Sequence, residues 1–187
     1  MRVCTATLES LSPLCQSRFH NTPKLEKESH DDYEKRTWRE KLRADDSGNV
    51  VIPPMSLKFA IDDAAKRLRM RIPGKGQSEY GKLLAGGVMV MDGLTLNVKK
   101  DDVEGQWLHL NADGRRGGGT RVMRCIPTIP KWKGEMVFYI IDDAIPNDVF
   151  EYHLNQAGMI VGIGQHRPGN GGFCGRFKVV KTKWTNQ

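Results

Sequence analysis

The stretch Val50–Leu68, VVIPPMSLKFAIDDAAKRL, decides the fold prediction, because it joins a short apolar strand to the clearest helical pattern in the chain. From Leu57 onward, apolar side chains recur at three- and four-residue spacing, and charged side chains fill the opposite face. Pro53-Pro54 cannot lie inside this helix, so we expect it to begin just after Ser56, a suitable N-cap. The predicted buried face consists of Leu57, Ala60, Ile61, Ala64, Ala65 and Leu68.

Apolar patterns on both sides of this helix predict the rest of a small α+β domain. Asp92-Gly93 is a favourable turn between two strands, and Gly158 is the expected end of a second helix. The expected elements are strands at Val3–Leu11, Val88–Met91, Leu94–Val98, Glu135–Ile141 and Phe177–Val180, and a second helix at Pro146–Ala157.

Two insertions interrupt an order of strand, helix, strand, strand, helix, strand. This order is that of the ferredoxin-like (RRM-like) fold, an antiparallel sheet with two helices on one face. We therefore expect a single domain over residues 1–187, with a charged insertion at 16–47 and a Gly/Arg-rich insertion at 99–133. The first is either partly helical around Tyr33–Leu42 or mobile, and the second contains a strand near Val122–Ile126. A different α+β arrangement of the same elements remains an alternative.

The composition favours a polyanionic partner. The 187 residues include 29 Lys and Arg against 22 Asp and Glu, a net charge of +7. The four cysteines are scattered, without a C-x-x-C pair or zinc-like spacing, so we expect reduced thiols, no metal and no cofactor. We also expect a cytoplasmic protein, since no apolar run suits a signal peptide or a membrane span. The five dispersed histidines form no catalytic pattern, and we assign no catalytic residue.

The segment from Gly162 to Phe177, GIGQHRPGNGGFCGRF, is the strongest candidate for a binding surface. It holds six glycines and two arginines, and no carboxylate occurs from Met159 to Gln187. Glycine lets backbone N–H groups approach a phosphate closely, and arginine pairs with phosphates or stacks on bases. A tight structural hairpin is the alternative. The expected nucleic-acid contacts here are Gly162, Gly164, His166, Arg167, Gly171, Gly172 and Arg176.

The second insertion adds another basic, glycine-rich segment. No acidic residue lies between Asp113 and Glu135, which favours phosphate binding over a solvated loop. Trp107 and Trp132 flank the segment and are either stacking platforms or core residues. The expected contacts are Arg115, Arg116, Arg121 and Arg124.

Two weaker candidates come from the predicted helices. Arg36, Arg39 and Arg43 share one helical face that lines an edge of the groove, although salt bridges to neighbouring glutamates are the stronger alternative. Ser56 and Lys58 suit a phosphate held at a helix N-terminus, with an ordinary surface lysine as the alternative.

Two of these segments resemble the RAMP superfamily, the RNA-binding subunits of CRISPR effector complexes. Residues 48–60, GNVVIPPMSLKFA, resemble the "IPGSSLKGALR" motif at the start of the first helix of that family. The glycine-rich loop ending in Gly175-Arg176-Phe177 resembles the loop before its last strand. Pro54-Met55 and Phe59 depart from the glycine and serine residues usual in that motif.

The resemblance implies a protein that grips single-stranded RNA and polymerises along it. The insertion at 99–133 stands where the family carries a β-hairpin "thumb" that intercalates between nucleotides. Some members cut RNA with an aspartate in the first insertion, but the sequence around Asp31-Asp32 does not match, so that role is not assigned.

Three hypotheses follow for the function. The first is a non-catalytic, largely sequence-independent protein that binds single-stranded RNA, or single-stranded DNA, as repeated subunits in a filament or larger ribonucleoprotein. The second is a metal-independent endoribonuclease with a histidine base, for which His20 and His30 are available. The third is a phage-encoded protein that mimics a RAMP subunit and inhibits an effector complex.

Overall fold

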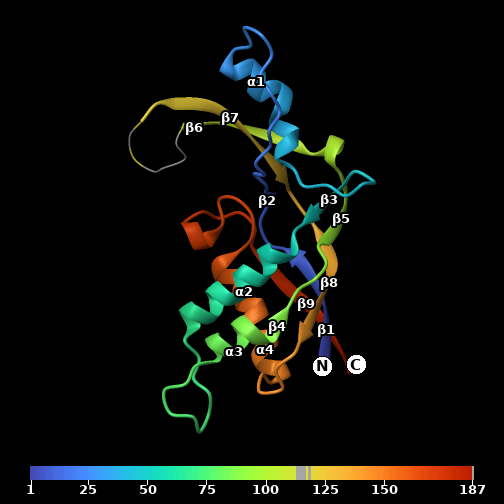
Figure 1. Cartoon of the computed structure of the whole chain (residues 1–187), viewed down its shortest axis with the longest axis vertical. Helices are drawn as coiled ribbons and strands as arrows, with labels where there is room; N and C mark the ends of the chain where they lie inside the picture. Colours follow the sequence, from blue (N-terminus) through green and yellow to red (C-terminus); the bar gives the residue numbers. More distant parts are fainter. Residues whose placement is uncertain (113–116, 118, 187) are drawn as a thin grey trace.

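The computed structural model describes residues 1–112, 117 and 119–186. Figure 1 shows an elongated molecule, with a sheet and its helices at one end and a long β-hairpin with a short helix at the other. Both chain termini lie at the sheet end (Figure 1). In the described part of the chain no helix is long and apolar enough to cross a membrane.

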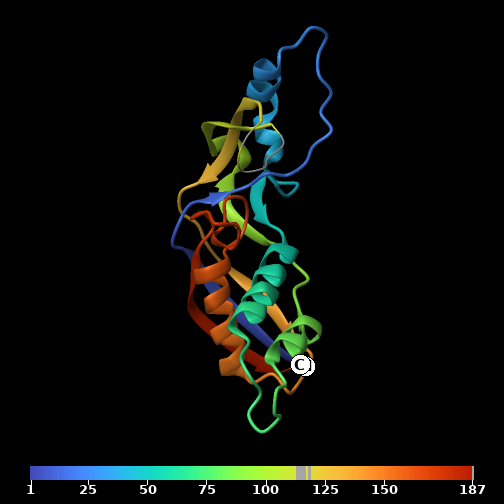
Figure 2. The ribbon, with the colours of Figure 1, turned by 90° about the vertical axis from the view of Figure 1, so that its left-hand side faces the viewer.

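The core is a four-stranded antiparallel sheet in the order β4-β8-β1-β9. Its strands are β1 (Arg2–Ser10), β4 (Val88–Met89), β8 (Lys133–Ile140) and β9 (Phe177–Asn186). Figure 2 shows the helices α2 (Pro54–Leu68) and α4 (Asn147–Gln156) side by side on one face of this sheet. The order β1, α2, β4, β8, α4, β9 confirms the predicted ferredoxin-like α+β class.

The apolar face of α2 packs into the core as its periodicity predicts. Five of the six predicted residues are buried, and Leu68, in the last turn, is half-buried. Across the core, the Phe138 and Phe150 rings lie 5.4 Å apart and join the sheet to α4. This burial anchors both helices on the sheet, since each buried aromatic or aliphatic side chain contributes about 1.5–3 kcal/mol.

The predicted start of the first helix, just after Ser56, and the predicted end of the second helix, at Gly158, are both wrong. Helix α2 begins at Pro54 rather than after Ser56, because proline at the first helical position lacks an N–H that would have no partner there anyway. Helix α4 does not stop at Gly158; it continues as the π-helix η3 (Ala157–Val161) and ends at Gly162, where φ is 70°. A side chain at Gly158 would overlap the Phe177 carbonyl, so that glycine permits close packing against β9.

The expected hairpin across Asp92-Gly93 is also wrong. Strand β4 pairs with β8, whereas β5 (Leu94–Lys99) pairs with β3 (Asn49–Ile52) in a separate two-stranded sheet. A Cβ at Gly93 would lie 2.7 Å from Val51 Cγ1, so the chain crosses here from one sheet to the other in close contact. Tertiary packing thus outweighed the local preference of Asp92-Gly93 for a hairpin turn.

The second insertion forms a long β-hairpin of β6 (Glu104–Asn111) and β7 (Arg121–Ile129), and β2 (Leu14–Cys15) pairs with β7. β7 therefore extends the predicted strand at Val122–Ile126. The other elements are α1 (His30–Thr37), η1 (Trp38–Lys41), α3 (Tyr80–Gly87), η2 (Lys100–Asp102) and η4 (Pro168–Asn170).

The first insertion packs on the hairpin through α1 and the 3-10 helix η1. Trp38 and Leu42 are buried there, which anchors this part of the insertion. The helical alternative for the segment around Tyr33–Leu42 is confirmed, as α1 followed after Thr37 by the 3-10 helix η1.

Candidate nucleic-acid interface

Two adjoining hollows lie where the hairpin, the first insertion, the glycine-rich loop and the start of α2 meet. The smaller has a volume of about 320 Å³ and the larger about 790 Å³, and both are bordered by Ser17 and Gln165. We call the pair the cationic groove. The smaller hollow is lined by Leu14, Gln16, Ser17, Arg18, Arg43, Ile52, Pro53, Ser56, Ile163, Gly164 and Gln165. The larger is lined by Ser17, Lys41, His109, Leu110, Asn111, Ala112, Gly117, Arg121, Arg124, Ile126, Gln165, His166, Asn170 and Gly172.

Seven of the residues predicted from the sequence meet in this groove. They come from four segments that are far apart in the chain, which fold together because β2 pairs with β7 and the loop bridges to β2. Arg43, Ser56 and Gly164 border the smaller hollow, and Arg121, Arg124, His166 and Gly172 border the larger one.

The groove carries positive charge without a carboxylate among its described lining residues. Arg18, Arg43 and Arg121 are exposed, and none of them forms an ion pair within the described part of the chain. These guanidinium groups are therefore available for an anionic ligand such as a phosphate.

A buried glutamate supports the hairpin wall from behind. The Glu34 carboxylate accepts hydrogen bonds from Lys41 Nζ and from the Cys125 backbone N–H, the latter at 2.7 Å, and Arg124 Nη1 lies 3.4 Å away. Burial would raise the pKa of this carboxyl, but those hydrogen bonds and the two cations outweigh burial and lower it. Two cations thus share one anion, which leaves the group with a net positive charge and holds Arg124 at the groove.

The glycine-rich loop is packed tightly against its own backbone and against β2. A side chain at Gly164 would overlap the Cys15 carbonyl, one at Gly172 the His166 carbonyl, and one at Gly175 the Ile163 carbonyl. Gly162, with φ of 70°, lies against Pro168 in the same way, whereas Gly171 is exposed. Close internal packing therefore accounts for most of these glycines, and their contact with a ligand stays a prediction.

Both arginines of this loop interact within the protein. Arg176 donates from Nε to the Met159 carbonyl at 3.1 Å and from Nη1 to the Phe173 carbonyl at 3.3 Å. Arg167 Nη2 lies 4.0 Å from the Asp63 carboxylate. Neither residue borders the hollows, so their role as phosphate contacts also stays a prediction.

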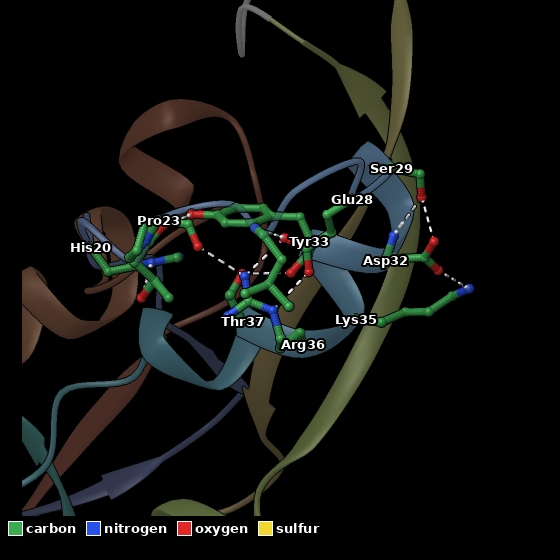
Figure 3. A network of polar contacts seen from close by, with 11 residues as sticks. His20, Pro23, Glu28, Ser29, Asp32, Tyr33, Lys35, Arg36 and Thr37 are labelled. Atoms are coloured by element: carbon green, nitrogen blue, oxygen red, sulfur yellow. Dashed lines mark hydrogen bonds and ion pairs between the residues drawn. The ribbon is translucent and has the colours of Figure 1, made fainter.

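The arginines of the first insertion do not share one edge of the groove. Arg36 donates to the Glu28 carboxylate at 2.7 and 2.9 Å and to the Pro23 carbonyl at 2.9 Å (Figure 3). The hydrogen bonds from Arg36 to Glu28, together with one from the Leu25 backbone N–H and the charges of Arg36 and Lys24, lower the pKa of Glu28 to about 2 despite partial desolvation. The Arg39 guanidinium stacks on Trp38 at 4.2 Å, and only Arg43 borders the groove.

Three other predicted contacts lie outside the groove's described lining. Lys58 Nζ lies 2.5 Å from Asp62 Oδ1 and donates to the Leu84 carbonyl at 3.3 Å, which favours a structural lysine. Arg115 and Arg116 lie outside the described residues. Of the two flanking tryptophans, Trp132 is a core residue, whereas Trp107 is 42% exposed on β6.

Sequence reasoning missed several lining residues. Arg18 and Lys41 belong to a segment whose mixed charges gave no reason to separate ligand-facing cations from paired ones. His109 belonged to no motif, and Gln165 lay within the glycine-rich segment but was not singled out as a contact. Within the described residues, no group of three or more His, Cys, Asp or Glu side chains is placed to hold a metal ion.

Comparison with known proteins shows the fold. No family model and no curated protein matches the sequence. A similar solved structure is the crystal structure of Cmr6 from Pyrococcus furiosus, with a TM-score of 0.51 and 13% identity over 95% of this chain and 97% of that chain. At this identity the likeness concerns the fold alone.

Proposed function

We propose that the protein binds single-stranded nucleic acid, RNA in preference, along the cationic groove and without cutting it. The observation that carries this proposal is the meeting of exposed Arg18, Arg43 and Arg121 along adjoining hollows that no described carboxylate lines. Phosphates bound there release counterions, which makes such binding strong and largely independent of sequence.

A single strand suits the chemistry of the groove better than a duplex does. Half-buried Leu110 lies among the cations, and an unpaired base can cover it, whereas Leu14, Ile52 and Ile126 are already buried by the protein. Trp107, exposed on β6 outside the described lining of the groove, offers a further stacking surface on the hairpin. A duplex would present mainly phosphates and leave Leu110 and Trp107 uncovered.

The groove is also a better candidate than the face of the main sheet turned away from the helices. RRM domains stack bases on aromatic side chains of their sheet. Here the corresponding positions of β1 and β8 include Thr5, Thr7 and Val137, and the one aromatic side chain among them is half-buried Tyr139. The hairpin side of the molecule therefore has the stronger case.

We further propose that the chain is a RAMP-type subunit that acts in the cytoplasm and assembles side by side along a strand into a larger ribonucleoprotein. The RAMP-like fold and the hairpin inserted between β4 and β8 support this proposal. A domain of this size covers only a few nucleotides, so a continuous coat requires repeated subunits.

The test compares two charge-reversal variants of equal charge. Arg43→Glu/Arg121→Glu changes both hollows, whereas Lys181→Glu/Lys183→Glu changes exposed lysines on β9. Fluorescence anisotropy with a labelled RNA across a salt series should show a loss of at least about tenfold in affinity and a flatter salt dependence for the groove variant alone. Equal losses in both variants would contradict binding in the groove.

One observation favours the endoribonuclease alternative. His109 and His166 border the same hollow as Lys41, so two imidazoles and a cation lie near one candidate phosphate site. Incubation of labelled RNA with the protein in EDTA separates the two functions. Intact RNA supports binding without cutting, whereas cleavage that disappears in His109→Ala would favour the enzyme.

A further inference from the structure

Two side chains at the centre of the cationic groove have unmade hydrogen bonds. Gln165 Oε1 and His166 Nε2 are buried, and neither has a hydrogen-bond partner in the described part of the chain. Both residues border the larger hollow, and Gln165 borders the smaller one as well. Buried polar groups are nearly always hydrogen-bonded, so two adjacent exceptions beside a hollow indicate a ligand-binding position.

The backbone at His166 is held in a strained conformation, and that at Gln165 is fixed by a hydrogen bond. His166 has φ of 55°, a left-handed value that is uncommon outside glycine. The Cys174 N–H donates to the His166 carbonyl at 3.0 Å, and the Gln165 N–H donates to the Cys15 carbonyl at 2.8 Å. Gly172 lies against the His166 carbonyl where no side chain fits. Strain that the surroundings enforce in this way is typical of ligand-binding positions.

The hollow beside them has the chemistry of a nucleobase site. Half-buried Leu110 supplies apolar surface for the flat body of a base, and Arg121 and Arg124 can hold the adjoining phosphates. The two unpaired atoms would face the polar edge of the base, with an acceptor at Gln165 Oε1 and, in the Nε2–H tautomer, a donor at His166.

Resting on the function proposed above, we propose that this hollow takes one base of the bound strand and selects adenine or cytosine. In both bases an exocyclic amino group, which donates to Gln165 Oε1, stands next to a ring nitrogen, which accepts from His166 Nε2. With Gln165 presenting Oε1 and His166 presenting Nε2–H, guanine and uracil would set a carbonyl against the acceptor and a ring N–H against the donor. The rest of the strand is held through phosphates and adds no base preference.

Both atoms are covered in the chain without its ligand, so the two side chains turn into the hollow when the base enters. This rotation gives Gln165 Oε1 and His166 Nε2, which lack hydrogen-bond partners without the ligand, one hydrogen bond each to the base. The new hydrogen bonds favour the rotation once the base is present. Because the loop backbone is held by β2, only side-chain rotation is required.

The experiment measures anisotropy with RNA oligonucleotides of equal length made of adenine, cytosine, uracil or purine, the last being adenine without its amino group. The wild type should bind adenine and cytosine about three- to tenfold tighter than uracil and purine. Gln165→Met, which removes the acceptor at similar size, should bind all four alike while keeping the salt dependence. His166→Asn, which tolerates a positive φ, should reduce the same preference.

Each outcome decides between the two proposals. Tight binding without base preference in the wild type would overturn the base selection and leave the groove as a phosphate-binding surface. A preference that survives in both variants would also overturn it, since Gln165 and His166 would then not be the selecting groups. No binding of any oligonucleotide would overturn the proposed function and this inference with it.

Discussion

Among single polar side chains, Glu34 is important for stability because it joins the first insertion to the hairpin. Its folded-state pKa is lowered, so the charged carboxylate stabilises the fold above the ordinary glutamate pKa of about 4.3 and loses that contribution as pH falls through the folded value. Replacing it would leave the buried Lys41 ammonium without its partner.

We expect Glu34→Gln to lower the free energy of unfolding by about 3 kcal/mol at pH 7, as for other broken buried pairs. Urea denaturation at pH 7 and below pH 4 measures the effect. The gap between wild type and variant should narrow in acid, because the wild-type carboxyl then takes up its own proton. Glu104→Gln on exposed β6 is the control and should change little; a gap independent of pH would contradict this account.

The arginines of the first insertion show that an ion-pair partner distant in sequence can decide whether a guanidinium group is available to bind a ligand. Arg36 and Arg43 look equivalent in the sequence, yet Glu28 engages Arg36, and Arg43 remains at the groove. The spacing of charges along a helix predicts pairs three or four residues apart. It does not predict a partner eight residues away on a folded-back loop.

Among elements, the glycine-rich loop depends on close backbone packing. Gly175 has φ of 72° and lies against the Ile163 carbonyl, whereas Gly74 has φ of 73° and open space around it. Alanine at either position would have to adopt a left-handed backbone conformation. Only alanine at Gly175 would also overlap a neighbouring atom, so comparing the two variants separates the cost of the backbone conformation from the cost of the overlap.

We expect Gly74→Ala to destabilise by about 1–2 kcal/mol, the cost of a left-handed alanine. Gly175→Ala should cost at least about 3 kcal/mol, because the overlap adds to that strain. Thermal unfolding of the two variants measures the difference. Equal melting temperatures would mean that the loop relaxes freely and that its packing contributes little.

For the whole molecule, repeated assembly along a strand has a direct physical consequence. Small nucleic-acid-binding domains cover about 4–16 nucleotides each, so an RNA of about 60 nucleotides should hold several subunits. Sedimentation velocity should show complexes that grow with RNA length, and electron microscopy should show extended particles on long RNA. One protomer per strand at every length would contradict assembly by repetition.

The order of helices and strands could be predicted because the buried face of each element follows from the spacing of apolar residues within that element. The three- and four-residue period of α2 and the alternation of β1 identify their buried faces without knowledge of any partner. Those periods, together with glycine and proline residues that mark the ends of elements, were enough to predict the ferredoxin-like fold class. They placed helix ends less well, as Pro54 and Gly158 show, because a cap depends on what packs beside it.

The groove could not be predicted in the same way, because its members are brought together only by pairing between distant strands. Arg18 and Gln165 meet because β2 pairs with β7 and bridges to the loop, contacts that span more than a hundred residues and leave no local pattern. The amino-acid sequence alone therefore determines which face of each helix or strand is buried. Long-range packing decides which cations remain without an ion-pair partner and which polar groups remain without a hydrogen bond.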